Sequence, residues 1–478
     1  MIDPAYYTSG MAMSRRKDRA RTPGLWVATN ELPRTGGHPF YQRLNQVLDQ
    51  HEFDAFVEAQ CATFYAPIGR PSLLPGTYFR LLLIGYFEGL DSERGIAWRA
   101  ADSLALRGFL GLGLDEAPPE HSTISRTRRL IDVETHRAVF TWILQVLATA
   151  DLVKGKTIGI DATTLEANAA LRSIVRRDSG ETYLEFLTRL AQASGIETPT
   201  RADLARLDRK RPKKGRNTDW QHPHDPDARI TKMKDGRTHL AHKAEHAVDL
   251  ETGAIVGVTV QGADQGDTTT IAETLTAAAE DLAAVATVTD DHTAVIDEVV
   301  ADKGYHSNQV LTDLAALDLR TYIAEPDRGR RHWTKKAVAR DAVYANRRRI
   351  RGVRGLALLR RRSEHLERPN AHLYNTGGMR RTHLRGHANI LKRLLVHTGA
   401  FNLGLLMRTL IGVGTPRGLQ GRLATVLTLV AALWTRVIDL WRRFDALFID
   451  LTSAFTPGHR LELLPVHTSE WAALTTGC

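Results

Sequence analysis

The stretch "KTIGIDATTLEANAAL", residues 156–171, decides the fold, because it joins a short apolar strand to a carboxylate. Residues 157–160 are predicted to form a buried strand, and Asp161 follows where this strand is predicted to end. A buried charge is costly unless it is paired, hydrogen-bonded or bound to a metal. The residues after Asp161 are predicted to leave the sheet, with Glu166 in a helix near the site.

A second predicted strand ends in the same way, because "EVVAD", residues 298–302, stops at Asp302. Equivalent strand ends can lie side by side in a sheet, so Asp161 and Asp302 could face one pocket. Paired carboxylates suit Mg²⁺ or Mn²⁺, which prefer hard oxygen ligands. Taken singly, each aspartate is also typical of a turn or a helix cap, and "ADKGY" could be a plain turn through Gly304.

The remaining patterns predict an α/β (α+β) fold, with a mixed sheet flanked by helices. Apolar residues recur at helical spacing over 38–131 and 134–151, whereas strand patterns alternate with helical ones between 238 and 325. Four parts are expected: a basic flexible tail (1–37), a helical N-terminal DNA-binding domain (38–151), a sheet domain (152–410) with an insertion over about 164–238, and a helical C-terminal extension (411–478).

The positive charge of the chain is concentrated in one segment. The 478 residues carry a net charge of +10, yet residues 328–393 alone hold 20 Lys and Arg against 3 acids. The rest of the chain holds 44 basic and 51 acidic residues and is slightly acidic. A localised basic surface of this size indicates a polyanionic partner, most plausibly nucleic acid. A solvated basic helix without a partner is the alternative.

Cysteine content and hydropathy indicate a cytoplasmic protein. Cys61 and Cys478 are far apart and are predicted to be free thiols, as in a reducing compartment. The apolar stretch over 423–435 is shorter than the roughly 20 residues that span a bilayer. We therefore expect no membrane partner and a buried helix within 422–450.

The segment "HSTISRTRRLI", residues 121–131, is predicted to be a helix capped by Ser122 or Ser125. A capped helix that presents Ser and Arg in its first turns is similar to a DNA-reading helix. An ordinary surface helix is an equally good interpretation. The side chains predicted to reach DNA from it are Ser125, Arg126, Arg128 and Arg129.

A metal pair needs a third acid, and the basic segment offers Glu364 and Glu367 in "LRRRSEHLERPNAHLYNTGG". The two glutamates are spaced i and i+3, on one face of a predicted helix. One of them could reach the aspartates if this helix packs on the sheet. A carboxylate among arginines could equally be a simple ion pair on a helix.

Several motifs together resemble a DDE transposase of a bacterial insertion sequence, over roughly residues 60–410. They are "HSTISRTRRLI", "TIGIDATTLEAN", "ITKMKDGRTHLAHKAEHAVDLETGAIVG", "GADQGDTTT", "VVADKGYHS" and "LERPNAHLYNTGGMRRTHLRGHANILKRLLVHTGAFNL". The resemblance implies an RNase H-like catalytic fold in which Asp161, Asp302 and Glu367 hold two Mg²⁺ (or Mn²⁺) ions. Two positions depart from the family. Ser363 stands where many relatives carry an Arg four residues before the Glu, and Tyr374 stands where they carry a Lys seven residues after it; Glu364 is therefore the alternative third acid.

The resemblance also implies that the protein cuts and joins DNA at the ends of a mobile element. The expected partners are terminal inverted repeats and target DNA, bound by a homodimer. The basic side chains predicted to contact DNA phosphates are Arg360, Arg361, Arg362, Arg368, Arg380, Arg381, Arg385 and Lys392. Two other functions stay open at this point, a metal-dependent nuclease on the same fold and a non-catalytic DNA-binding protein derived from a transposase. An RNA-binding protein is disfavoured, because the sequence lacks an aromatic-basic signature.

Overall fold

Six of the described strands form one mixed sheet with β1 at its centre. β1 is antiparallel to β5 and parallel to β7, β7 is parallel to β8, and β6 and β4 both pair antiparallel with β5. The observed fold is therefore α+β, as predicted, and it is consistent with an RNase H-like domain. The strands are β1 (Thr157–Glu166), β4 (Arg229–Lys232), β5 (Thr238–Asp249), β6 (Ile255–Gly262), β7 (Glu298–Ala301) and β8 (Arg320–Ile323).

The structure is a computed structural model that describes residues 37–66, 72–211, 215–233, 235–289, 295–327, 329, 331–419, 430–431, 433–438 and 440–441. The tail predicted over 1–37 lies outside the described residues except for its last position. Most of the predicted C-terminal extension, including much of the helix expected within 422–450, lies outside them as well.

β1 is longer than predicted, and this corrects two expectations. The strand leaves β7 after Ile160 but stays paired with β5 as far as Glu166, which lies opposite Ala241. Asp161 therefore lies within a strand, and Glu166 is a strand residue that also forms a β-bridge to Arg381. The long strand β5 supplies backbone partners beyond Ile160, and two threonines in the added part favour extended structure.

The N-terminal region is helical, as predicted. Helix α3 is buried along almost its entire length, so it lies inside this region and not on its surface. The helices are α1 (Pro39–Gln50), α2 (Phe53–Cys61), α3 (Pro75–Phe87), α4 (Glu93–Asp102), α5 (Leu104–Phe109), α6 (His121–Leu130) and α7 (Val133–Thr149), and a 3₁₀ turn η1 (Ala62–Phe64) follows α2.

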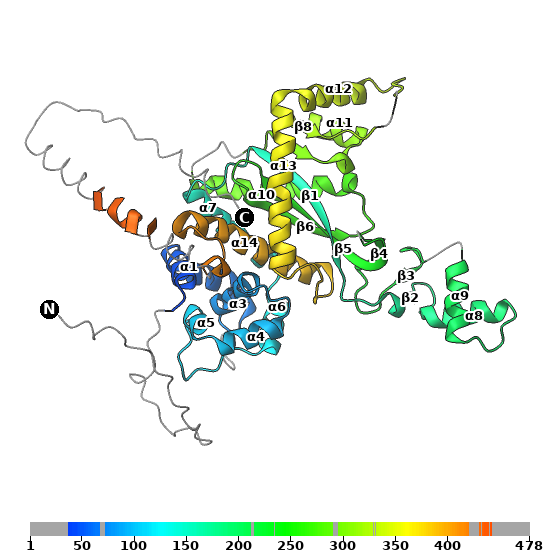
Figure 1. The fold of residues 1–478 in the computed structure, drawn as a ribbon, viewed down its shortest axis with the longest axis horizontal. Coiled ribbons are helices and arrows are strands. Elements are labelled where there is room, and N and C mark those ends of the chain that lie inside the picture. Colours follow the sequence, from blue (N-terminus) through cyan, green and yellow to red (C-terminus); the bar gives the residue numbers. More distant parts are fainter. Residues whose placement is uncertain are drawn as a thin grey trace, which may run out of the picture. The chain divides into compact units, whose positions relative to one another are not determined.

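Helices pack on both faces of the sheet, and Figure 1 shows α13 beside the strands. Helix α10 (Asp267–Thr289) contacts β5 and β6, so close to β6 that a Cβ on Gly257 would meet the backbone of Ala278 at 3.0 Å. Helix α13 (Val353–Ala371) contacts β1, β7 and β8, and Leu358 forms a separate apolar cluster with Val300 of β7. Helices α11 (Asn308–Ala316) and α12 (Ala337–Arg351) contact β8.

Helix α14 (His387–Ile411) joins the N-terminal helices to the sheet, because it contacts α3, α7 and β6. The Asn402 side chain accepts a hydrogen bond from the Ile255 amide at 2.9 Å and donates one to its carbonyl at 2.8 Å. Among the described residues, one helix, within His387–Leu419, is long and apolar enough to span a membrane, and 72% of its apolar window is buried inside the protein. Such burial fits the core helix of a folded domain.

The predicted insertion contains two helices and a small sheet of its own. α8 (Tyr183–Ala193) and α9 (Arg201–Lys210) each begin with a capping box, and they follow a 3₁₀ turn, η2 (Leu171–Ser173). Strand β2 (Val175–Arg176) pairs with β3 (Trp220–Gln221), and the Trp220 ring contacts α8 through Tyr183 and Phe186. These contacts attach the helical hairpin to the end of β1.

Candidate active site

Asp161 and Asp302 lie next to each other on adjacent parallel strands. The last residue pair between β1 and β7 is Ile160 with Ala301; Asp161 is the next residue of β1, and Asp302 is the residue that follows β7. Side chains alternate between the faces of a strand. Because Ile160 belongs to the large apolar core, Asp161 points to the opposite face, where it contacts Arg362 of α13.

Asp302 is held by the short 3₁₀ turn η3 (Lys303–Tyr305) that follows β7. Its Oδ1 atom accepts a hydrogen bond from the Gly304 amide at 2.7 Å, so Asp302 caps this turn. A Cβ on Gly304 would lie 2.6 Å from Oδ2 of Asp267 and 2.9 Å from Oδ1 of Asp302. A Cβ at this position would therefore displace one of the two carboxylates.

Asp161 is compensated by two side chains of α13. Nη2 of Arg362 donates to Oδ1 of Asp161 at 2.9 Å, and Nδ2 of Asn370 donates to Oδ2 at 3.0 Å. Arg354 of α13 pairs with Glu298 at 2.6 Å, and Arg362, eight residues later, pairs with Asp161. Glu298 lies opposite Thr157, four residues before Asp161, so about one turn of α13 corresponds to two residues of strand. The charge at Asp161 is thus paired, as a carboxylate at this depth requires.

The third predicted acid does not join the two aspartates. Glu367 is exposed on α13, and no three His, Cys, Asp or Glu side chains of the described residues come together as a metal site. Glu367 precedes Asn370 by three residues, so the two lie on the same side of the helix. Glu364 lies about 200° round the helix from Arg362 and faces away from the sheet; its nearest cation is Arg368 at 3.9 Å. Helix geometry favours Glu367 as the acid nearer to the site.

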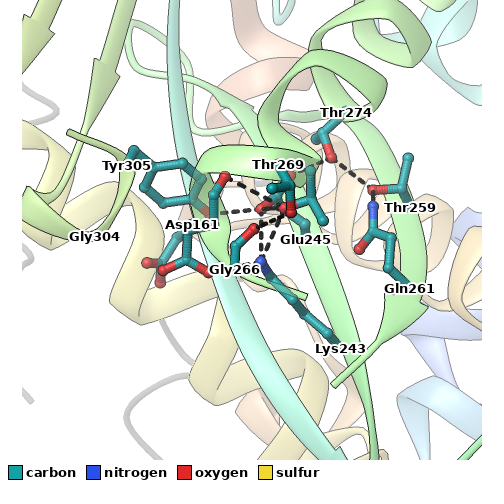
Figure 2. Close-up of polar contacts among 12 residues, drawn as sticks. Asp161, Lys243, Glu245, Thr259, Gln261, Gly266, Thr269, Thr274, Gly304 and Tyr305 are labelled. Carbon is teal, nitrogen blue, oxygen red and sulfur yellow. Dashed lines mark hydrogen bonds and ion pairs between the residues drawn. The ribbon is translucent and has the colours of Figure 1, made fainter. Parts of the chain in front are cut away.

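A buried polar network lies directly behind the aspartates, on the α10 side of the sheet, and the sequence interpretation missed it. Glu245 of β5 is fully buried and accepts hydrogen bonds from the hydroxyls of Thr270, Thr274 and Tyr305 at 2.8, 2.5 and 2.8 Å. Figure 2 shows Tyr305, Lys243 and Thr274 converging on Glu245. The network ties β5 and α10 to the turn that carries Asp302.

The Lys243 ammonium and the Tyr305 hydroxyl complete this network. Nζ of Lys243 lies 2.6 Å from Oδ1 of Asp267 and 3.5 Å from Oε1 of Glu245, so one buried ammonium serves two carboxylates. Burial, with the Glu245 carboxylate beside it, raises the pKa of Tyr305 far above its usual value, so its hydroxyl stays protonated and donating. A signal existed in "HKAEH", because alternation places Lys243 and Glu245 on one face of a strand.

The opposite face of β5 places a neutral histidine near Asp161. His246 lies opposite Asp161 in the β1–β5 register, and its Nε2 atom shares a hydrogen bond with the Tyr374 hydroxyl. Burial lowers the pKa of His246 to about 4 and raises the pKa of Tyr374 well above its usual value. Both groups are therefore uncharged at neutral pH and add no charge to the site.

Helix α6 differs from the predicted DNA-reading helix in two ways. It begins at His121 after Glu120, so neither Ser122 nor Ser125 caps it. Arg126 and Arg129 are exposed, as a phosphate contact requires, but Arg128 is buried and pairs with Glu93 at 2.7 Å. The structure therefore gives Arg128 a packing role in place of the predicted DNA contact, and Ser125 accepts a hydrogen bond from it at 3.2 Å.

The basic side chains predicted on residues 360–392 fall into two groups. Arg362 contacts Asp161, and Lys392 is buried with Nζ donating to the Arg128 carbonyl at 3.1 Å, so Lys392 is also corrected to a packing role. Whether a basic side chain is buried depends on residues far away in the sequence, and these cannot be identified from local charge counts. The exposed group is Arg360, Arg361, Arg368, Arg380, Arg381 and Arg385.

The donors present at Asp161 and Asp302 suit a hard divalent cation, because both are carboxylates at one edge of the sheet. The Arg362 guanidinium balances the negative charge of Asp161, and a bound metal cation would balance it in the same way. The described geometry thus offers two adjacent oxygen ligands, with Glu367 on the covering helix as the further acid.

Two family models match this chain. One, described as "Transposase domain (DUF772)", matches residues 30–130, which include α1 to α6. The other, described as "Transposase DDE domain", matches residues 217–403, which include Asp302 and Glu367. β1 and Asp161 lie between the two matched ranges. A comparison with curated proteins found no match.

Proposed function

We propose that this chain, which belongs to the DDE transposases of insertion sequences, binds the ends of its element and catalyses metal-dependent cleavage and strand transfer of DNA. The observation that carries this proposal is the register of β1 and β7, which brings Asp161 and Asp302 to neighbouring positions just beyond the last pair of these two strands. In-line phosphoryl transfer needs mainly positioning and charge neutralisation, so a protein nucleophile is not required.

Asp161, Asp302 and Glu367 would hold two Mg²⁺ or Mn²⁺ ions. Such ions activate water or a DNA 3′-hydroxyl and stabilise the leaving oxygen. The chain itself contributes the positions of the acids: η3 fixes Asp302, and α13 presents Arg362 to Asp161. Arg362 would help to neutralise a phosphate brought to this site, because its guanidinium already lies beside Asp161.

Exposed arginines on both sides of the site would bind DNA backbone. Arg126 and Arg129 lie on α6, and Arg360, Arg361 and Arg368 lie on α13, all of them exposed. Such contacts orient the duplex and make binding salt-dependent without selecting a sequence. We further propose a homodimer that brings two element ends together, acting in the cytoplasm on the nucleoid.

The test is cleavage and joining of a labelled duplex that carries the flanking element end, with and without Mg²⁺. We expect Asp161→Asn and Asp302→Asn to abolish both reactions and to leave DNA binding largely intact. Asp341→Asn is the matched control, because this aspartate is 68% exposed on α12 and pairs with a surface arginine. Unimpaired cleavage by either site variant would show that the aspartates do not form the reaction centre.

The same assay separates the two alternative functions. A nuclease would cut the duplex in Mg²⁺ but never join the cut end to target DNA. A non-catalytic DNA-binding protein would retain the duplex with no Mg²⁺-dependent cleavage at all, and its aspartate variants would behave like the parent.

A further inference from the structure

We propose that the insertion and the loop over residues 380–386 together form a binding pocket for one phosphodiester of the DNA backbone. This inference rests on the proposed function and assigns to it a contact outside the acidic site. The feature behind it is a cavity of about 390 Å³. Its lining includes Ser173, His222, His224, Arg381 and Arg385.

The pocket is built at a fixed place, because the loop is held at both ends. At its start, the Glu166 amide donates to the Arg380 carbonyl at 3.1 Å, and the Thr382 amide donates to the Glu166 carbonyl at 2.9 Å. At its end, the Gly386 amide donates to Asp225 of the insertion at 3.1 Å. The backbone that carries Arg381 and Arg385 is thus anchored to β1 and to the insertion.

The donors in the pocket suit a phosphate oxygen. Arg381 has a side chain that is 60% exposed, and Arg385 makes no ion pair within the described part of the chain. Arginine forks match phosphate geometry in a bidentate manner. His222 is 4% exposed, and its Nδ1 accepts a hydrogen bond from the His224 amide, which leaves the ring proton on Nε2 as a donor.

The acids around the pocket offset only part of its positive charge. Asp225 is fully buried and pairs with His242 at 3.1 Å, behind the cavity wall. Glu166 lies 3.8 Å from Nε of Arg381 and 3.9 Å from His239, so it offsets part of one charge. Burial, reinforced by Arg385, lowers the pKa of His222, so this ring is a neutral donor at pH 7. The surplus positive charge comes from the two arginines.

The position of the pocket follows from β1, which connects it to the acidic site. Asp161 and Glu166 are five residues apart on one strand, and a strand rises about 3.3 Å per residue, so they lie about 17 Å apart. Phosphates of one DNA strand are spaced about 3.4 Å along the helix axis. A duplex bound at Asp161 carries backbone phosphates at about this distance, so the pocket is within reach of the same DNA.

The experiment replaces single phosphates of the element-end duplex by uncharged methylphosphonates and measures affinity by fluorescence anisotropy. When the replacement is scanned along the duplex, we expect about tenfold weaker binding of the parent chain at the one phosphate that occupies the pocket. In an Arg381→Gln, Arg385→Gln variant, the same replacement should have no further effect. The slope of log affinity against log salt should also fall by about 0.9 in this variant, because one phosphate is no longer neutralised by the protein.

Two more variants guard against misfolding and non-specific charge effects. Ala170→Asp adds a carboxylate to the opposite, exposed wall of the cavity, keeps both arginines, and should weaken binding in a manner that depends on the same phosphate. Ala193→Asp, at the exposed end of α8 outside the cavity, is its control and should leave the phosphate profile unchanged.

The outcomes distinguish this inference from the proposed function. If the parent binds and cleaves but the methylphosphonate penalty is equal in parent and arginine variant, the pocket is refuted and the function stands. If the penalty disappears in the variant but no chain cleaves DNA in Mg²⁺, the pocket stands and the catalytic proposal falls. A parent chain that does not bind the duplex refutes both.

Discussion

Tyr305→Phe tests whether the network around Glu245 holds the turn that carries Asp302. The change removes one hydroxyl, which donates to a fully buried carboxylate at 2.8 Å, and leaves the ring in place. A hydrogen bond to a charged group contributes about 1.5–3 kcal/mol. Because Thr270, Thr274 and Lys243 still face Glu245, we expect the free energy of unfolding to fall by about 2 kcal/mol.

Urea unfolding of the full chain measures this loss, and Tyr65→Phe is the matched control. The Tyr65 hydroxyl donates to the Leu73 carbonyl at 3.0 Å, a neutral acceptor, so its removal should cost about 1 kcal/mol. Mg²⁺-dependent cleavage should also fall for Tyr305→Phe and not for Tyr65→Phe, since only the first loosens the turn at Asp302. Equal unfolding free energies for the two variants would refute the role assigned to Glu245.

Three further perturbations address other parts of the molecule. Gly304→Ala should impair cleavage far more than folding, as measured by activity beside thermal unfolding, because its Cβ would meet the Asp302 carboxylate at 2.9 Å. Arg128→Met should destabilise the fold by about 3 kcal/mol, because it leaves the largely buried Glu93 carboxylate unpaired, and it should leave the salt slope of DNA binding unchanged. Arg126→Met should instead reduce that slope by about 0.9. Burial lowers the pKa of His136 from 6.5 to about 4, so up to about 3 kcal/mol of stability is present above pH 6.5 and is lost as the pH falls toward 4; unfolding of a His136→Gln variant across this range should show a shallower pH dependence.

The sequence predicts the order of elements well, because apolar periodicity depends on neighbours in the chain. It also predicts the adjacency of Asp161 and Asp302, since both follow the buried part of a strand. It could not predict how far β1 continues, because the partner that extends it to Glu166 is Ala241, far along the chain. The local charge pattern predicted that Arg128 contacts DNA. In the folded chain Arg128 pairs with Glu93 instead.

The Glu245 network shows a second limit of sequence reasoning. Strand β5 is buried on both faces, so its alternation of polar and apolar residues does not mark an exposed face. The polar residues are satisfied by α10 and η3, which lie on segments that only the fold brings together. A charged residue in a buried strand was the available signal, and its partners were not predictable.

The match between α13 and the strands beneath it makes the lengths of these segments interdependent. Four residues of helix advance about 6.0 Å and two residues of strand about 6.6 Å, so the two repeats drift apart by only about 1.2 Å over two steps. Deleting one residue of α13 between Arg354 and Arg362 would turn the remainder by about 100° and carry the guanidinium away from Asp161. Sequence drift in this helix should therefore proceed by substitution, with gains and losses of residues confined to the segments outside it.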